Sequence, residues 1–192
     1  FAGQQDTYLN VVGEDDVLAA VRDCWASLWT DRAIRYRAEH LPDLAAADPE
    51  AADTLALAVV VQKLVPAEAA GVMFTANPAD GRTEETVITA AWGLGEAVVS
   101  GLVDTDTIVV DPAAGRVLST QVADKAVRID SAPGARGTRT LDNPDDQRRA
   151  PVLTAADALR LARLGRDIEA HFGAPVDRKS TRLNSSHSEL SR

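Results

Sequence analysis

The chain has 192 residues, of which 45% are hydrophobic and 26% are charged, as in an average soluble globular protein. This composition excludes collagen-like, coiled-coil and wholly disordered proteins, and the length allows one ordinary domain or one lobe of a larger one. The 29 acidic residues exceed the 20 basic ones, and the net charge of −9 disfavours broad nucleic-acid binding.

Membrane insertion and disulfide bonding are also disfavoured by the sequence. No segment approaches the run of about 18 apolar residues that a membrane span requires. The one cysteine, Cys24, excludes an internal disulfide framework and fits a reducing cytosol, so we expect a cytoplasmic protein. Cys24 lies in an apolar helical pattern, which favours a plain buried thiol over a reactive one. The chain begins at Phe1 rather than Met, and we therefore expect it to be part of a longer protein.

The first third of the chain predicts a loop, a helix and a second loop. Residues 1–10 read as a loop followed by a short extended piece. Asp15 or Asp16 is placed to cap a helix that we expect to run to about Arg37. Residues 41–54 are rich in Ala, Asp and Pro and predict a connecting loop. The expected buried stripe of the helix is Val17, Leu18, Val21, Cys24, Trp25 and Leu28.

The rest of the chain predicts several strands and one more helix. The β-branched run at 57–65 predicts a buried strand. Further strands are expected at 72–75, 87–92, 107–111, 116–122 and 126–129, and an exposed loop at 131–150. Thr154 to Asp157 has the form of a capping box, and Gly173 and Pro175 end the helix that follows. Its expected stripe is Leu161, Leu164, Ile168 and Phe172.

The last stretch, residues 178–192, is rich in serine and has no apolar periodicity. It resembles the peptide obtained when adapter or vector DNA is translated in frame. We therefore interpret it as a disordered tail that arises from sequencing or cloning, with a natural flexible tail as the alternative.

Three groups of residues carry the chemical hypotheses. In the turn Gly93-Leu94-Gly95-Glu96, backbone amides could approach a phosphate, and the acid could hold Mg²⁺ or hydrogen-bond a ribose or a neighbouring loop. The alternative is a tight turn that needs glycine only for its φ angles. The amide of Gln62 could read a purine edge, or simply alternate with apolar neighbours. The cluster Arg32, Arg35 and Arg37 either forms a solvated helix face or braces a loop over an anionic ligand. The histidines form no triad, one cysteine makes no metal motif, and we assign no catalytic residue and no metal ligand.

Four long strings in order resemble one known family: FAGQQDTYLNV, CWASLWTDRAIRYR, VVVQKLVPAEAAGVMFTANPADGR and AAWGLGEAVVSGLV. They are similar to the ATP-binding domain of phosphoenolpyruvate synthase and pyruvate phosphate dikinase, which rifampicin phosphotransferase shares. The resemblance implies an α/β (α+β) fold of ATP-grasp type, with a mixed sheet flanked by helices. It covers residues 1–177, which would form an incomplete AMP/ATP-binding domain.

The resemblance also implies the ligands and the residues that bind them. ATP with Mg²⁺ would give a phosphoryl group to a histidine on another domain, which passes it to pyruvate or to the antibiotic. Gly3 and Thr7 match the phosphate-side loop of the family, Gln62 its adenine pocket, and Glu96 a turn near the nucleotide. Asp106 matches an aspartate for which we expect a structural role.

Family motifs expected before Phe1 and after Asp177 do not occur in this sequence. They include the ATP-binding lysine and arginine on one side, and a metal-binding acid on the other. The phosphohistidine and acceptor-binding domains would also be partners outside this chain. We expect the chain alone to be inactive, without tight ATP binding. The alternatives are part of a rifampicin phosphotransferase, a non-catalytic nucleotide-binding module, and a piece that does not fold alone.

Overall fold

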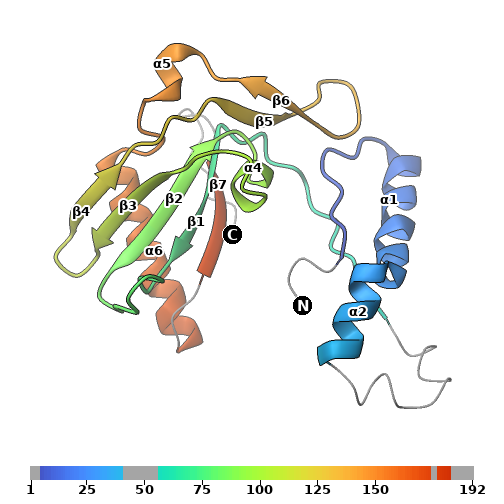
Figure 1. Ribbon diagram of the computed structural model, residues 1–192, viewed down its shortest axis with the longest axis horizontal. Helices are drawn as coiled ribbons and strands as arrows, with labels where there is room; N and C mark the ends of the chain where they lie inside the picture. The colour runs from blue at the N-terminus through green and yellow to red at the C-terminus, as the bar shows by residue number, and fades with distance from the viewer. Residues whose placement is uncertain (1–4, 41–55, 174–176, 183–192) are drawn as a thin grey trace. The chain divides into compact units, whose positions relative to one another are not determined.

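The computed structural model describes residues 5–40, 56–173 and 177–182 (Figure 1). These residues form two compact units. Unit 1 comprises Phe1–Leu64 together with Ala132–Gly137, and unit 2 comprises Val65–Ser131 together with Thr138–Arg192. Helices and antiparallel sheets occur together, so the predicted α+β class is confirmed.

Unit 1 is helical, but the single helix predicted up to Arg37 is wrong. The chain forms α1 (Glu14–Ala26), a 3₁₀ turn η1 (Ser27–Trp29) and α2 (Asp31–His40). The interruption occurs because Thr30 is extended, with φ −66° and ψ 149°, and the Oγ1 of Thr30 accepts a hydrogen bond from the Ala33 amide at 3.4 Å. Thr30 therefore caps a new helix instead of continuing the first one.

The predicted buried stripe of this helix is only partly correct. Leu28 is buried, but Leu18 and Trp25 are 56% and 50% exposed. The other residues of the stripe are half-buried: Val17, Val21 and Cys24. Within unit 1, α1 therefore presents apolar side chains to solvent.

The strand predicted at 57–65 is also wrong. Residues 56–67 have no regular secondary structure, and Val60 and Val61 are 84% and 66% exposed. A β-branched run becomes a strand only where a neighbouring strand satisfies its amides and carbonyls. No described strand pairs with this segment. Instead, the indole Nε1 of Trp25 donates a hydrogen bond to the Leu57 carbonyl at 3.0 Å.

Unit 2 is built on a five-stranded sheet in the order β4-β3-β2-β1-β7. The strands are β1 (Ala69–Phe74), β2 (Thr86–Trp92), β3 (Asp106–Asp111), β4 (Arg116–Gln121) and β7 (Asp177–Arg182). Every pairing between the described strands of this sheet is antiparallel, which corrects the prediction of a mixed sheet. Among the described residues, the parallel contact is a single bridge between Gly93 and Ile129.

The strand β7 differs from the disorder predicted for 178–192. Its residues pair with β1 from Phe74 opposite Asp177 to Ala69 opposite Arg182. Hydrogen bonding between strand backbones needs no apolar periodicity, so the serine-rich sequence of this segment did not indicate a strand. The remainder of the predicted tail, residues 183–192, lies outside the described residues.

Helix α6 (Ala155–Phe172) packs on one face of the sheet and completes the core (Figure 1). The predicted capping box is confirmed, because the Asp157 amide donates to the Thr154 hydroxyl and the Asp157 carboxylate accepts from the Thr154 amide. Gly173 ends the helix in the left-handed region, with φ +70°. The residues of α6 that are fully buried are small: Ala158, Ala162 and Gly165. They let the helix approach the sheet closely, whereas Phe172 of the predicted stripe is 64% exposed.

A second, two-stranded sheet consists of β5 (Val127–Ser131) and β6 (Thr138–Asp142). Two short helices accompany it, α4 (Glu96–Val99) and α5 (Asp145–Arg148). The exposed loop predicted at 131–150 is therefore partly wrong, because five of its residues form β6 and four form α5. No helix in the described part of the chain has the length and apolarity that crossing a bilayer requires.

Candidate nucleotide-binding site

The glycine-rich turn follows β2 and leads into α4. Gly93 has φ +83°, and a Cβ at this position would lie 2.4 Å from the Ile129 carbonyl oxygen. Only glycine permits this close approach of the turn to β5. The Gly93 amide donates to the Glu68 carbonyl at 2.8 Å, and the Leu94 amide donates to the Ile129 carbonyl at 2.7 Å. Both amides are used within the protein, which favours the tight-turn interpretation over a phosphate cradle formed by these two groups.

Glu96 is the first residue of α4 and is exposed. Its Oε2 accepts a hydrogen bond from the Thr138 hydroxyl at 2.9 Å. The carboxylate is thereby held by β6 and still reaches solvent, so it could accept a hydrogen bond from a ligand or contact a cation. No group of three or more His, Cys, Asp or Glu side chains gathers in the described residues. Glu96 could therefore supply one metal ligand there, but not a complete set.

The predicted phosphate-side loop lies in unit 1. Gly3 falls outside the described residues, and Thr7 is exposed. The neighbouring Asp6 is anchored twice, because its amide donates to the Ser27 hydroxyl at 3.2 Å and its carboxylate pairs with Arg32 at 3.1 Å. Both members of the ion pair are about half exposed, and such pairs contribute little stability. Arg32 thus contacts this loop, while the interpretation of the arginine cluster as a brace over an anionic ligand stays a prediction.

Gln62, the predicted adenine-side residue, is exposed in the irregular segment 56–67 and belongs to unit 1. Glu96 belongs to unit 2. Thr7 and Gln62 therefore belong to one compact unit and Glu96 to the other. Sequence matching alone could not reveal this, because it carries no information on pairing partners.

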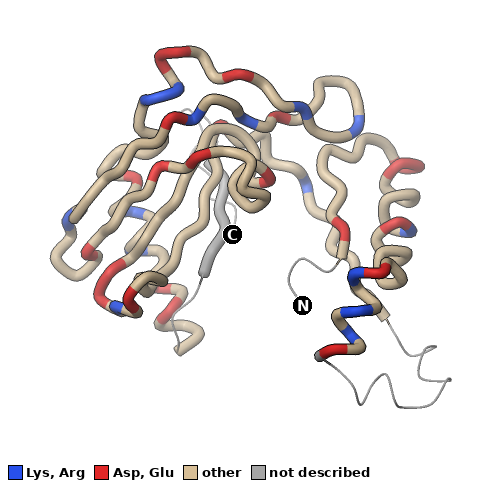
Figure 2. The backbone as a smooth tube through the Cα atoms, viewed as in Figure 1, with Lys and Arg blue, Asp and Glu red and all other residues tan. Residues whose placement is uncertain are grey.

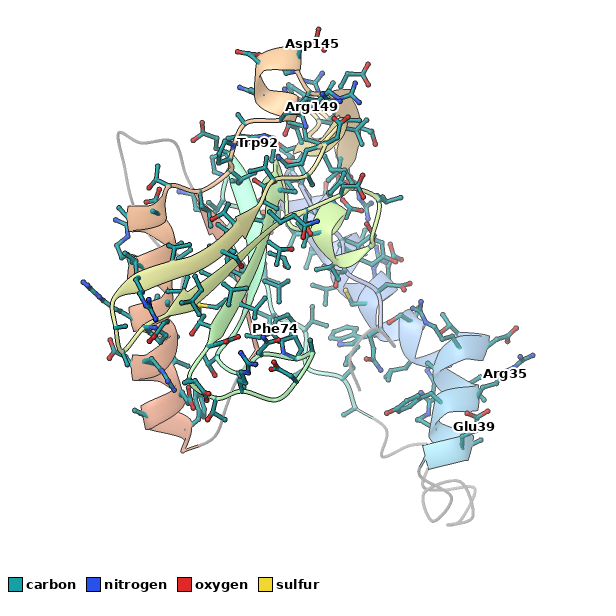
Figure 3. All side chains as sticks on the ribbon, turned by 60° about the vertical axis from the view of Figure 1, so that its left-hand side comes forward. Arg35, Glu39, Phe74, Trp92, Asp145 and Arg149 are labelled. Atoms are coloured by element: carbon teal, nitrogen blue, oxygen red, sulfur yellow. The ribbon has the colours of Figure 1, made fainter. Side chains whose placement is uncertain are left out.

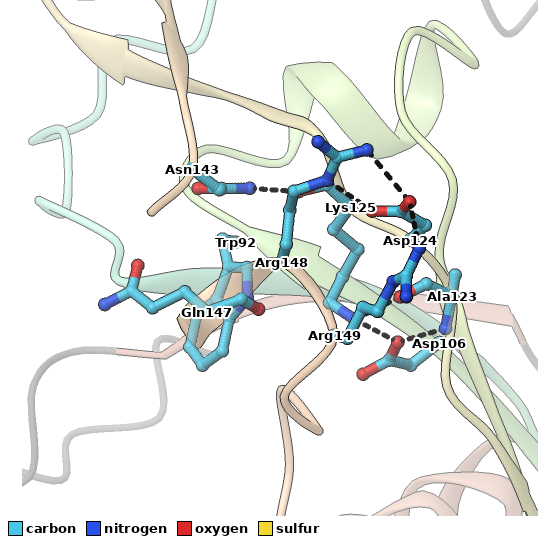
Figure 4. A network of polar contacts seen from close by, with 9 residues as sticks. All are labelled: Trp92, Asp106, Ala123, Asp124, Lys125, Asn143, Gln147, Arg148 and Arg149. Atoms are coloured by element: carbon cyan, nitrogen blue, oxygen red, sulfur yellow. Dashed lines mark hydrogen bonds and ion pairs between the residues drawn. The ribbon is translucent and has the colours of Figure 1, made fainter. Parts of the chain in front are cut away.

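Asp106, for which the sequence predicted a structural role, is the centre of a buried polar network in unit 2 (Figure 4). Asp106 is 1% exposed and Lys125 is 0% exposed. The Lys125 Nζ lies 2.5 Å from Asp106 Oδ1, and the amides of Ala123 and Val152 donate to the same carboxylate at 2.9 and 2.8 Å. Sequence analysis missed Lys125, because nothing in the local pattern distinguishes a buried lysine from an exposed one.

A second, more exposed ion pair lies beside this network. Arg148 donates two hydrogen bonds to Asp124, and Arg149 also pairs with it. The Arg148 hydrogen bond lowers the pKa of Asp124 below its ordinary value. Figure 2 shows acidic and basic residues alternating in the segments around α5, and Figure 3 shows Trp92 beneath that helix. The Trp92 Nε1 donates to the Gln147 carbonyl at 3.0 Å, so the end of β2 is joined to the α5 segment.

Unit 2 combines helices with antiparallel sheets, so it has an α+β fold, and a glycine-rich turn joins β2 to α4. Residues 1–178 match the family model of the pyruvate phosphate dikinase AMP/ATP-binding domain, which is of ATP-grasp type. The chain therefore belongs to this AMP/ATP-binding domain family.

Curated relatives agree with the family. A "Rifampicin phosphotransferase" of Streptomyces sp is 45% identical over 177 residues, which are 92% of this chain and 19% of the relative. A "Probable phosphoenolpyruvate synthase" of Methanocaldococcus jannaschii is 44% identical over 178 residues, or 92% of this chain and 14% of the relative. A "Prodigiosin synthesizing transferase PigC" of Serratia marcescens is 43% identical, with 92% and 19% covered. The chain thus spans a fifth or less of the length of these three relatives.

Proposed function

We propose that this chain is the ATP-binding portion of a dikinase that transfers phosphate from ATP to a catalytic histidine on another domain, and from there to pyruvate. The observation that carries the proposal is the match of residues 1–178 to an AMP/ATP-binding domain. The similarity to a probable phosphoenolpyruvate synthase supports pyruvate as the acceptor. In the net reaction, pyruvate, ATP and water give phosphoenolpyruvate, AMP and phosphate.

In this proposal, Gly3 and Thr7 contact the phosphates, Gln62 the adenine, and Glu96 the nucleotide or its Mg²⁺. The exposed Thr7 beside the anchored Asp6 supports the first assignment. The Glu96 carboxylate, held by Thr138 and open to solvent, supports the last. Phosphoryl transfer depends on positioning and on neutralising the charge of the phosphates. The histidine domain and the acceptor-binding domain would be partners of this chain in the complete protein.

A second candidate differs only in the acceptor. The 45% identity to a rifampicin phosphotransferase supports phosphorylation of rifampicin, with inactivation of the antibiotic, as the alternative. Both candidates use ATP in the same way, and the residues that choose the acceptor would lie elsewhere in the complete protein. Acceptor-dependent release of AMP distinguishes the two: pyruvate, but not rifampicin, should stimulate it in the complete protein. The reverse result would establish the alternative.

The chain alone should neither turn over ATP nor bind it tightly. Thr7, Gln62 and Glu96 are all exposed, so any hydrogen bond that they make with ATP replaces one with water and adds little affinity. Isothermal titration with ATP and Mg²⁺ should show binding weaker than micromolar. A micromolar dissociation constant would contradict this expectation.

Weak binding can still identify the site by nuclear magnetic resonance. Titration with millimolar ATP should shift the amide signals of Thr7, Gln62 and Glu96. The variant Glu96→Gln should reduce the affinity, whereas the matched control Glu84→Gln, an exposed acid outside the turn, should not. Absence of any shift at these residues in the wild-type chain would refute the proposed binding site.

A further inference from the structure

The buried pair Lys125–Asp106 holds together segments that are distant in the sequence. Asp106 is the first residue of β3, and it accepts hydrogen bonds from Lys125, from the Ala123 amide and from the Val152 amide. The Lys125 Nζ also donates to the Ala123 carbonyl at 3.0 Å. One carboxylate thus joins the start of β3 to the segment before β5 and to the segment before α6.

The same lysine lies at the base of the hairpin formed by β5 and β6. Asn143 follows β6 directly, and its Nδ2 donates to the Lys125 carbonyl at 2.7 Å. The Asn143 amide donates to the Ala126 carbonyl at 2.9 Å, and the Lys125 amide donates to the Arg148 carbonyl at 3.0 Å. The start of β5 and the end of β6 therefore both lie next to residues that hydrogen-bond at Lys125 (Figure 4).

Further along, the hairpin contacts the glycine-rich turn at two places. The Ile129 carbonyl of β5 accepts from the Leu94 amide at 2.7 Å. The Thr138 hydroxyl of β6 donates to Glu96 at 2.9 Å. Every residue on this path from Asp106 to Glu96 belongs to unit 2. A shift of the hairpin base would therefore move the groups that orient the Glu96 carboxylate.

We propose that Lys125 and Asp106 are positioning residues, which fix the hairpin β5–β6 and through it orient Glu96 toward the nucleotide. The orientation of Glu96 toward a nucleotide rests on the proposed function. Stability alone does not explain the pair, because the free energy lost by removing two charges from water is about as large as the free energy gained from their attraction. Replacing a buried ion pair with apolar residues therefore often leaves the stability of a protein unchanged. An apolar pair would fill the same space, but it would not bind the amides of Ala123 and Val152.

Amide hydrogen exchange of the 192-residue chain tests the positioning role without nucleotide. The double variant Asp106→Asn with Lys125→Met removes both charges and leaves no unpaired one. The amide of Leu94, which donates to β5, should then exchange at least about tenfold faster, while the amides of β2 stay near their wild-type rates. The matched control Val110→Ala removes buried volume from β3 without touching the pair, and it should accelerate all of these amides together.

Three outcomes would overturn the positioning role. Equal acceleration of Leu94 and β2 in the double variant would show general destabilisation. Unchanged exchange of Leu94 would show that the hairpin does not depend on the pair. Loss of the cooperative urea transition would show that the pair is needed for folding itself.

The link to the nucleotide is tested separately at Thr138. In Thr138→Val the ATP-induced shift of the Glu96 amide should be lost, and Thr138→Ser, which keeps the hydroxyl, should restore it. A Glu96 shift that persists in Thr138→Val would overturn the link. If wild-type Glu96 shows no response to ATP, the proposed binding role of Glu96 fails and its positioning toward the nucleotide fails with it, while the exchange experiment still decides whether the pair positions the hairpin.

Discussion

Replacing Gly93 with alanine tests the contact between the turn and the hairpin most directly. A non-glycine residue at φ +83° costs about 1–2 kcal/mol. The new Cβ would lie 2.4 Å from the Ile129 carbonyl oxygen, a separation that real Cβ atoms do not show. The strand β5 must therefore move away, which breaks the hydrogen bond from the Leu94 amide and costs about 0.5–1.5 kcal/mol more. Together these terms predict a loss of roughly 1.5–3.5 kcal/mol for Gly93→Ala.

The neighbouring glycine provides a matched control in the same turn. Gly95 has φ −62°, and its added Cβ would lie 3.6 Å from the Cβ of Ala70, an ordinary contact. Gly95→Ala should therefore change the free energy of unfolding by less than about 1 kcal/mol. Urea unfolding followed by circular dichroism measures both variants. Equal stability of Gly93→Ala and Gly95→Ala would refute the described packing of β5 on the turn.

Three further predictions concern single side chains. Arg148 lowers the pKa of Asp124, so this carboxylate contributes stability above roughly pH 4, and that stability is lost as the pH falls through the lowered folded pKa. The urea midpoints of the wild type and of Asp124→Asn should therefore converge on acidification. A difference between the midpoints that stays constant with pH would contradict this. Thr154→Ala should destabilise α6 by about 1 kcal/mol in urea unfolding and Thr154→Ser by less, since serine keeps the capping hydroxyl; equal losses would show that the cap contributes nothing. Burial raises the pKa of Cys24, so iodoacetamide should alkylate this thiol more slowly at pH 8 in the folded chain than in the chain unfolded in urea. Free cysteine, measured in buffer and in urea, is the reference for each rate. Equal relative rates in the folded and unfolded chain would contradict a shielded thiol.

The sequence alone determined the features that depend on neighbouring residues. The capping box at Thr154 and the glycine at 173 defined α6, because caps involve side chains within one turn of the helix. Short apolar segments located β1 to β4 to within a few residues, and the long family strings indicated the family to which residues 1–178 belong.

The tertiary structure decided whatever depends on residues distant in the chain. The run at 57–65 has the composition of a strand, yet no described strand pairs with it, and composition does not supply a partner. From the sequence, the amides of the turn could approach a phosphate, but in the structure the Gly93 and Leu94 amides donate to the carbonyls of Glu68 and Ile129. Lys125 is buried only because the chain returns to place Asp106 beside it. The burial of a side chain and its hydrogen-bond partners depend on residues that are distant in the sequence. Local sequence patterns therefore predict caps and turns, whereas only the packing of the chain determines burial and pairing.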